Sequence, residues 1–131
     1  MKFYIDTCIW RDYFEDRKDK FRPLGEWAFH LIKYAIKNNI SILYSDLIIR
    51  ELKDNEELIA YITTGEDSFL KIDISEFQAK EAHNLSKRLK IPFQDVLHAI
   101  LARDNEAILI TRDKHFEMLD IVEVKKPEDL I

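Results

Sequence analysis

Residues 92–116 read PFQDVLHAILARDNEAILITRDKHF and place a helix pattern directly before a strand pattern. Pro92 suits the first turn of a helix, and Asn105 suits the position just past a helix end. Between them apolar residues recur at helical spacing and form a wide stripe, made of Phe93, Val96, Leu97, Ile100 and Leu101. Two alanines keep the opposite side small, which predicts a buried helix. Asp95 nevertheless lies in its early turns.

The strand pattern, Ala107–Ile110, is an unbroken apolar run of the kind found in parallel strands that are covered on both faces. Thr111, Arg112 and Asp113 follow it. One carboxylate therefore lies early in a buried helix, and another lies just past the carboxyl end of a buried strand. Because burying a charge is costly, this arrangement indicates either a functional site or an energetically expensive accident.

The composition is that of a soluble globular chain, with 47% hydrophobic and 34% charged residues among 131. This length suits one domain, and we expect a single domain over residues 1–131. No apolar run is long enough to span a membrane or to form a signal-peptide core. The single cysteine, Cys8, excludes an internal disulfide and suits a cytoplasmic location.

The net charge is −5, from 20 basic and 25 acidic residues, which excludes a nucleic-acid binder that relies on a general positive field. A chain of this charge that handles nucleic acid needs local basic groups and a metal ion. Only two glycines are present, Gly25 and Gly65, and neither belongs to a glycine-rich phosphate loop. Nucleotide-binding loops of the P-loop or dinucleotide type are therefore excluded.

Strand patterns and helix patterns alternate along the rest of the chain. Further strands are predicted over residues 2–5, 40–44, 69–72 and 121–124. Further helices are predicted over residues 7–16, 24–37, 45–52, 56–63, 75–89 and 114–119, with Thr7 capping the first and a Ser75–Gln78 capping box opening the fifth. This alternation predicts an α/β three-layer sandwich with a central, mostly parallel sheet of about five strands.

Glu51 lies on the inward-facing side of its helix. With Leu47 at zero on a helical wheel, Ile48 falls at about 100° and Glu51 at about 40°. The carboxylate is therefore predicted to lie between two apolar positions and not on the solvent-exposed face of the helix.

Four acids are thus candidates for one site: Asp6 and Asp113 at strand ends, and Glu51 and Asp95 on inward helix faces. In parallel sheets ligands bind outside the carboxyl ends of the strands. Each acid alone has an ordinary structural explanation, such as capping a helix or reaching solvent. Two carboxylates about 4 Å apart, however, repel by roughly 4 kcal/mol at an effective dielectric near 20. Such a cluster favours Mg²⁺ or Mn²⁺ over zinc as its counter-ion.

Four short motifs occur in order along the chain: FYIDT at residues 3–7, SDLIIREL at 45–52, DVLHA at 95–99 and TRDKHF at 111–116. They resemble the strand with Asp-Ser/Thr, the helix with Glu-Leu, the Asp-x-x-His/Ala helix and the Thr-x-Asp-x-x-Phe signature of the PIN domain family, especially its VapC-type toxins. The resemblance covers nearly the whole chain, and all four acidic positions are filled.

The resemblance implies a PIN-like domain with strand order 3-2-1-4-5 and the activity of a metal-dependent endoribonuclease, the toxin of a VapBC-type toxin–antitoxin pair. We expect Asp6, Asp95 and Asp113 to hold one or two Mg²⁺ or Mn²⁺ ions, and Glu51 to complete the shell or orient the attacking water. The metal would lower the pKa of that water and stabilise charge on the scissile phosphate of the RNA.

Residues beside the acids are candidates for substrate binding. Thr7 and Thr111 carry hydroxyls that can position water or phosphate, although helix capping explains them equally well. Arg112, Lys114 and His115 flank Asp113 and are expected phosphate contacts. The toxins that the chain resembles pair as homodimers and bind a small antitoxin along an apolar groove near the acids. Exposed members of an aromatic group would form such a groove here: Trp10, Tyr13, Phe14, Trp27 and Phe29, with Trp27 expected in the core.

Two other classes of function share parts of this pattern. Haloacid-dehalogenase-like phosphatases also begin with a strand-end aspartate but need Asp-x-Asp, and Cys8 stands where the second aspartate would be. A PIN-fold RNA-processing nuclease or RNA-binding scaffold that is not a toxin remains an alternative. We expect Cys8 to serve packing, and we favour packing among helices for His98 over a position facing the site.

Overall fold

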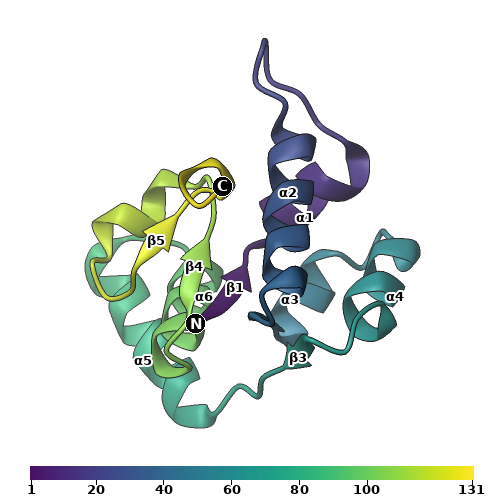
Figure 1. Ribbon diagram of the computed structural model, residues 1–131. Coiled ribbons are helices and arrows are strands. Elements are labelled where there is room, and N and C mark those ends of the chain that lie inside the picture. The colour runs from purple at the N-terminus through teal and green to yellow at the C-terminus, as the bar shows by residue number, and fades with distance from the viewer.

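The computed structural model describes residues 1–131 and shows a five-stranded parallel sheet (Figure 1). The strands are β1 Lys2–Ile5, β2 Ser41–Tyr44, β3 Phe69–Lys71, β4 Ile108–Ile110 and β5 Val124–Lys125. Their order across the sheet is β3-β2-β1-β4-β5, and all four neighbouring pairs are parallel. The predicted fold class and strand order are both confirmed.

Six α-helices and two short 3₁₀ helices connect the strands. They are α1 Thr7–Glu15, α2 Leu24–Lys37, α3 Asp46–Glu51, α4 Glu56–Thr64, α5 Glu76–Leu89, α6 Phe93–Asp104, and the 3₁₀ helices Lys114–Met118 and Pro127–Asp129. Helix α1 packs on α2, and α5 packs on α6. The chain moves from β1 to β2 on one side and from β3 back to β4 on the other, so right-handed crossovers place these two helix pairs on opposite faces of the sheet (Figure 1). None of the helices combines the length and the hydropathy of a membrane span.

The core explains why the apolar runs form strands. Phe3, Tyr4 and Ile5 of β1 are fully buried, as is Leu109 of β4, so the two central strands are covered on both faces. Edge-to-face aromatic contacts extend this core, with Trp10 packing against Tyr61 and Phe69. The expected unbroken apolar strands thus occupy the middle of the sheet.

The predicted last strand was wrong in its bounds. We expected residues 121–124, whereas the ladder holds only Val124 and Lys125. Asp120 takes a left-handed backbone conformation with φ of 50°, and hydrogen bonds from Leu109 N–H to Glu123 O and from Thr111 N–H to Lys125 O set the register. The apolar pair Ile121–Val122 instead packs half-buried against the core.

Two capping predictions had different outcomes. The Ser75–Gln78 capping box is present, with both reciprocal hydrogen bonds formed. The cap of α1 is Asp6 and not Thr7, because the Asp6 carboxylate accepts from Thr7 N–H. An N-cap aspartate satisfies an N–H of the first turn that has no partner within the helix.

The covered position of β4 leads to a test of the core. We expect Leu109→Ala to lower the free energy of unfolding by about 3 kcal/mol, because truncation of a fully buried leucine leaves a cavity. Leu70→Ala on the edge strand β3 is the matched control, since Leu70 is 46% exposed. Equal losses in urea denaturation would contradict the assignment of β4 to the centre of the sheet.

Candidate metal-binding site

Asp6 is placed by the pairing of the two central strands. Its N–H donates to Ile110 O at 2.9 Å, which continues the ladder in which Ile5 faces Ile110. One carboxylate oxygen accepts from Thr7 N–H at 2.8 Å, and the other accepts from the Thr111 hydroxyl at 2.7 Å. Asp6 is therefore buried and held by neutral donors from β1 and from the end of β4.

Glu51 is the last residue of α3 and points toward Asp6, as the helical wheel predicted. Its Oε1 accepts from the Thr7 hydroxyl and from His98 Nε2, each at 2.7 Å. Burial opposes the ionisation of Glu51, but these hydrogen bonds outweigh it and lower the pKa of the carboxyl below its ordinary value. Both bonds go to Oε1, so Oε2 has no hydrogen-bond partner in the protein.

His98 faces the acids, contrary to the position that we favoured from sequence. Its Nε2 lies 4.0 Å from Asp6 Oδ1 as well as 2.7 Å from Glu51. Its Nδ1 lies 2.7 Å from the Tyr4 hydroxyl, which in turn lies 2.8 Å from Ser45 Oγ. Burial raises the pKa of Tyr4 far above its ordinary value, so the phenol keeps its proton. With Glu51 ionised, Nε2 must carry the proton that it donates, and the imidazole holds the carboxylate in place.

Asp95 and Asp113 form a second group with His115. Asp95 lies in the first turn of α6, and Asp113 follows β4 and caps the 3₁₀ helix Lys114–Met118. His115 Nδ1 lies 3.3 Å from one oxygen of each carboxylate. Burial raises the pKa of Asp95, and the charges of Asp113 and Asp6 raise it further. The second group therefore lies within electrostatic reach of the first.

The four predicted acids thus meet at one edge of the sheet, in two adjacent groups instead of one. Asp6, Glu51 and His98 have ligand atoms within 4.8 Å of one another, and so do Asp95, Asp113 and His115. Either set offers carboxylate oxygens to a divalent ion, and the ordinary explanations hold as well, since Asp6 and Asp113 both cap helices.

The other predicted residues occupy different surroundings. The hydroxyls of Thr7 and Thr111 donate to Glu51 and Asp6. Lys114 is exposed beside Asp113. The Arg112 guanidinium is turned away from the acids: it bonds Asp12 at 3.3 Å and Glu128 at 2.8 Å, and it lies 5.5 Å from the ring of Trp27, which is half-buried and not in the core.

Several residues were not found from the sequence. Tyr4 and Ser45 have no signal beyond ordinary strand and capping residues. Asp12 follows Ile9 by three residues and so falls on the buried side of α1, which was a usable signal for its pairing with Arg112.

Cys8 Sγ lies 3.5 Å from Asp6 and 3.7 Å from Thr111 Oγ1. Burial and the nearby Asp6 charge raise the pKa of the Cys8 thiol to about 12, so it is not a nucleophile at neutral pH.

Comparison with known proteins gives the family. The model of the PIN domain matches residues 3–122. The chain belongs to the PIN domain family. PIN domains are nucleases, and the acidic groups of this one lie where a divalent ion can bind. No curated protein matches the sequence significantly.

Solved structures share the fold of this PIN domain at low sequence identity. VapBC2 from Rickettsia felis, solved with a fragment of promoter DNA, has a TM-score of 0.70 at 18% identity, over 96% of this chain and 98% of that chain. FitAcB from Neisseria gonorrhoeae has a TM-score of 0.67 at 15% identity, over 98% and 99%. A toxin–antitoxin complex from Klebsiella pneumoniae has a TM-score of 0.64 at 22% identity, over 95% and 96%.

The buried series of hydrogen bonds that joins Ser45, Tyr4, His98 and Glu51 can be tested for its contribution to the stability of the site. We expect Tyr4→Phe to lower the free energy of unfolding by about 1–3 kcal/mol, because it leaves the Ser45 hydroxyl and His98 Nδ1 buried without this partner. Tyr44→Phe is the matched control, since Tyr44 is also buried but its hydroxyl makes no hydrogen bond within the protein. If both variants unfold at the same urea concentration, the hydrogen-bonded chain does not support the site.

Proposed function

We propose that this PIN domain is a Mg²⁺- or Mn²⁺-dependent endoribonuclease and the toxin of a toxin–antitoxin pair. The observation that carries the proposal is the meeting of four carboxylates at the carboxyl edge of the sheet, two that follow β1 and β4 and two that lie on α3 and α6. Family membership supports nuclease chemistry, and the division of the acids into two adjacent groups suits one or two ions.

The donor set fits a hard divalent ion. Three of the four acids keep a carboxylate oxygen without a hydrogen bond: Glu51 Oε2, Asp95 Oδ1 and Asp113 Oδ2. None of these atoms is buried away from solvent. Oxygen ligands of this kind suit Mg²⁺ and Mn²⁺. We therefore assign Asp6, Glu51, Asp95 and Asp113 as the residues that would hold the ion.

Such an ion, when bound, lowers the pKa of a water and stabilises charge on a phosphate oxygen. The chain's own residues prepare the site for that chemistry. His98 and Thr7 fix Glu51 as an ionised carboxylate, so its free Oε2 can complete the shell of the ion or orient the attacking water. Thr111 fixes Asp6, and Lys114 lies beside Asp113 as a phosphate contact.

A partly exposed aromatic surface on α1, α2 and α4 supports the toxin proposal. Tyr13 stacks on Phe29 at 6.3 Å and on Tyr61 at 5.5 Å between ring centres. Phe14 and Phe29 stay 38% and 42% exposed, whereas Trp10 is fully buried. We propose that a small antitoxin covers this aromatic surface and that two copies of the domain pair. Two of the structural neighbours, VapBC2 and the Klebsiella pneumoniae complex, are toxin–antitoxin complexes.

Metal binding is tested by thermal unfolding with and without Mn²⁺. We expect Mn²⁺ to stabilise the wild type, by about 2.7 kcal/mol at roughly 100 times its dissociation constant. Asp95→Asn should lose most of this response and yet be more stable without metal, on the order of 1 kcal/mol, because the ionised Asp95 is buried near Asp113 and Asp6.

The pH dependence has a definite sign. The folded-state pKa of Asp95 is raised, so its ionisation costs folding free energy above that pKa, and the advantage of Asp95→Asn should shrink as the pH falls and Asp95 takes up a proton. Asp67→Asn, before β3 at the opposite edge of the sheet, is the control for lost negative charge. An equal Mn²⁺ response in wild type and Asp95→Asn would remove Asp95 from the ion's ligands.

Nuclease activity is tested on single-stranded RNA with Mn²⁺. We expect Asp6→Asn to reduce the cleavage rate by more than the roughly 10- to 100-fold that loss of an outer-shell partner costs. Glu57→Gln on the exposed first turn of α4 is the control. Growth arrest on expression, lost in Asp6→Asn, would separate a toxin from a processing nuclease. Wild-type cleavage rates in both Asp6→Asn and Asp95→Asn would contradict the metal site.

A further inference from the structure

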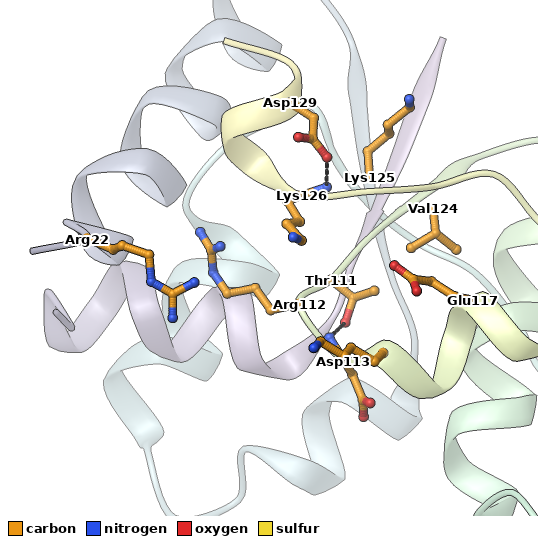
Figure 2. A pocket seen from close by; sticks show the side chains of 10 residues that line it. Arg22, Thr111, Arg112, Asp113, Glu117, Val124, Lys125, Lys126 and Asp129 are labelled. Carbon is orange, nitrogen blue, oxygen red and sulfur yellow. Dashed lines mark hydrogen bonds between the residues drawn. The ribbon is translucent and has the colours of Figure 1, made fainter. Parts of the chain in front are cut away.

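A polar cavity of about 320 Å³ opens beside Asp113, on the side of β4, β5 and the C-terminal segment (Figure 2). Val124 is the one apolar residue among the ten that line it. Five lining residues are basic: Arg22, Arg112, Lys114, Lys125 and Lys126. Three are acidic: Asp113, Glu117 and Asp129. Basic residues thus outnumber acidic ones by two in the lining, and Arg22 and Arg112 also have carboxylate partners outside it.

The three lysines of the cavity are not neutralised by ion pairs. Lys71 on β3 binds Asp46, but no salt bridge involves Lys114, Lys125 or Lys126. One carboxylate oxygen of Asp129 is already occupied, because it accepts from the backbone N–H of Lys126 at 3.0 Å. The cavity thus offers cations that have no anionic partner within the protein.

Two guanidinium groups also come together at this cavity. In Figure 2 the side chains of Arg22 and Arg112 extend toward each other, and Lys126 points into the space beside Arg112. Arg112 is held rigidly by Asp12, Glu128 and Trp27, and its Nη2 is buried without an acceptor. Arg22 is paired with Asp19 in an exposed loop. Each guanidinium therefore already has a carboxylate partner, and the unpaired positive charge of the cavity comes from its lysines.

The lining favours a phosphate over an acidic protein segment. Arginine pairs match the oxygens of phosphate through paired N–H donors. A docked protein segment needs an apolar core to its interface, and this cavity has one apolar residue. Thr111 and Asp113 belong both to the cavity wall and to the acidic edge, so a strand that has one phosphate at the acids can place another here.

We propose that this cavity binds a backbone phosphate of the RNA next to the one that is cleaved, with Arg22 and Lys126 as its movable cations and Arg112 as its fixed one. This proposal rests on the proposed ribonuclease function. It adds the residues that would bind the RNA backbone next to the acidic site.

The test is binding of a fluorescently labelled single-stranded RNA of about a dozen nucleotides, measured by anisotropy in EDTA so that no cleavage occurs. In Arg22→Ala/Lys126→Ala we expect the dissociation constant to rise about tenfold at low salt. Between roughly 50 and 200 mM salt, the slope of log K against log salt should fall by about 0.7, the value for one phosphate contact on a single strand. Lys33→Ala/Lys37→Ala removes the same charge from the last turns of α2, next to the amino-terminal edge of the sheet, and should change neither quantity.

Circular dichroism and thermal unfolding show whether each variant is folded, and Lys126→Arg in the wild-type background should retain the affinity. Unchanged RNA affinity and salt slope in the folded double variant would overturn the proposal even if the wild type cleaves RNA. Lost affinity in the double variant would uphold it even if no cleavage is found with Mn²⁺. Stronger binding of a poly-glutamate peptide than of RNA with the same number of charges would overturn it in favour of an acidic protein segment.

Discussion

The hydrogen bond from Asp6 N–H to Ile110 O is the contact on which the arrangement of the acids depends. It closes the ladder between β1 and β4, two strands separated by most of the chain, and makes them end at the same level. Asp6 is thereby brought within 2.7 Å of Thr111, and Asp113 follows two residues later. Because the strand order reverses beside β1, the two helix pairs diverge there and leave this edge open.

The hydrogen-bond donors of the acids distinguish the proposed site from ordinary ion pairs. Arg112 forms ion pairs with Asp12 and Glu128. The two Nη atoms of Arg103 donate to the two carboxylate oxygens of Glu81. Asp6 and Glu51 are held instead by an amide, two threonine hydroxyls and an imidazole. The amide and hydroxyl donors fix a carboxylate without cancelling its charge, so the edge keeps its affinity for an external cation.

The sequence predicted what depends on local periodicity and on chain direction. The inward position of Glu51 follows from its place on α3, and the positions of Asp6 and Asp113 follow from the ends of apolar strands. The contact of His98 with Tyr4 and Glu51 joins residues 94 and 47 positions apart, and no spacing rule reaches that far. The ion pairs of Arg112 were missed for a related reason. Its carboxylate partners lie on α1 and near the C-terminus, and a cation after a strand appears free until those elements are positioned. The predicted bounds of β5 were wrong because the register of this short strand is set by its pairing with β4 and not by its own apolar residues.

An acidic protein that binds a polyanion must change the sign of the field at its site. Without an ion, the carboxylates at this edge repel a phosphate and also raise the pKa of Asp95. A divalent ion would cancel that repulsion while the arginines and lysines of the neighbouring cavity remain in place. For a domain that binds both an ion and RNA at this edge, as we propose, the two affinities are coupled, and by thermodynamic reciprocity each ligand strengthens the binding of the other by the same factor. The net charge of −5 is therefore compatible with RNA binding, because the local balance of charge at one edge of the sheet determines the field that the substrate meets.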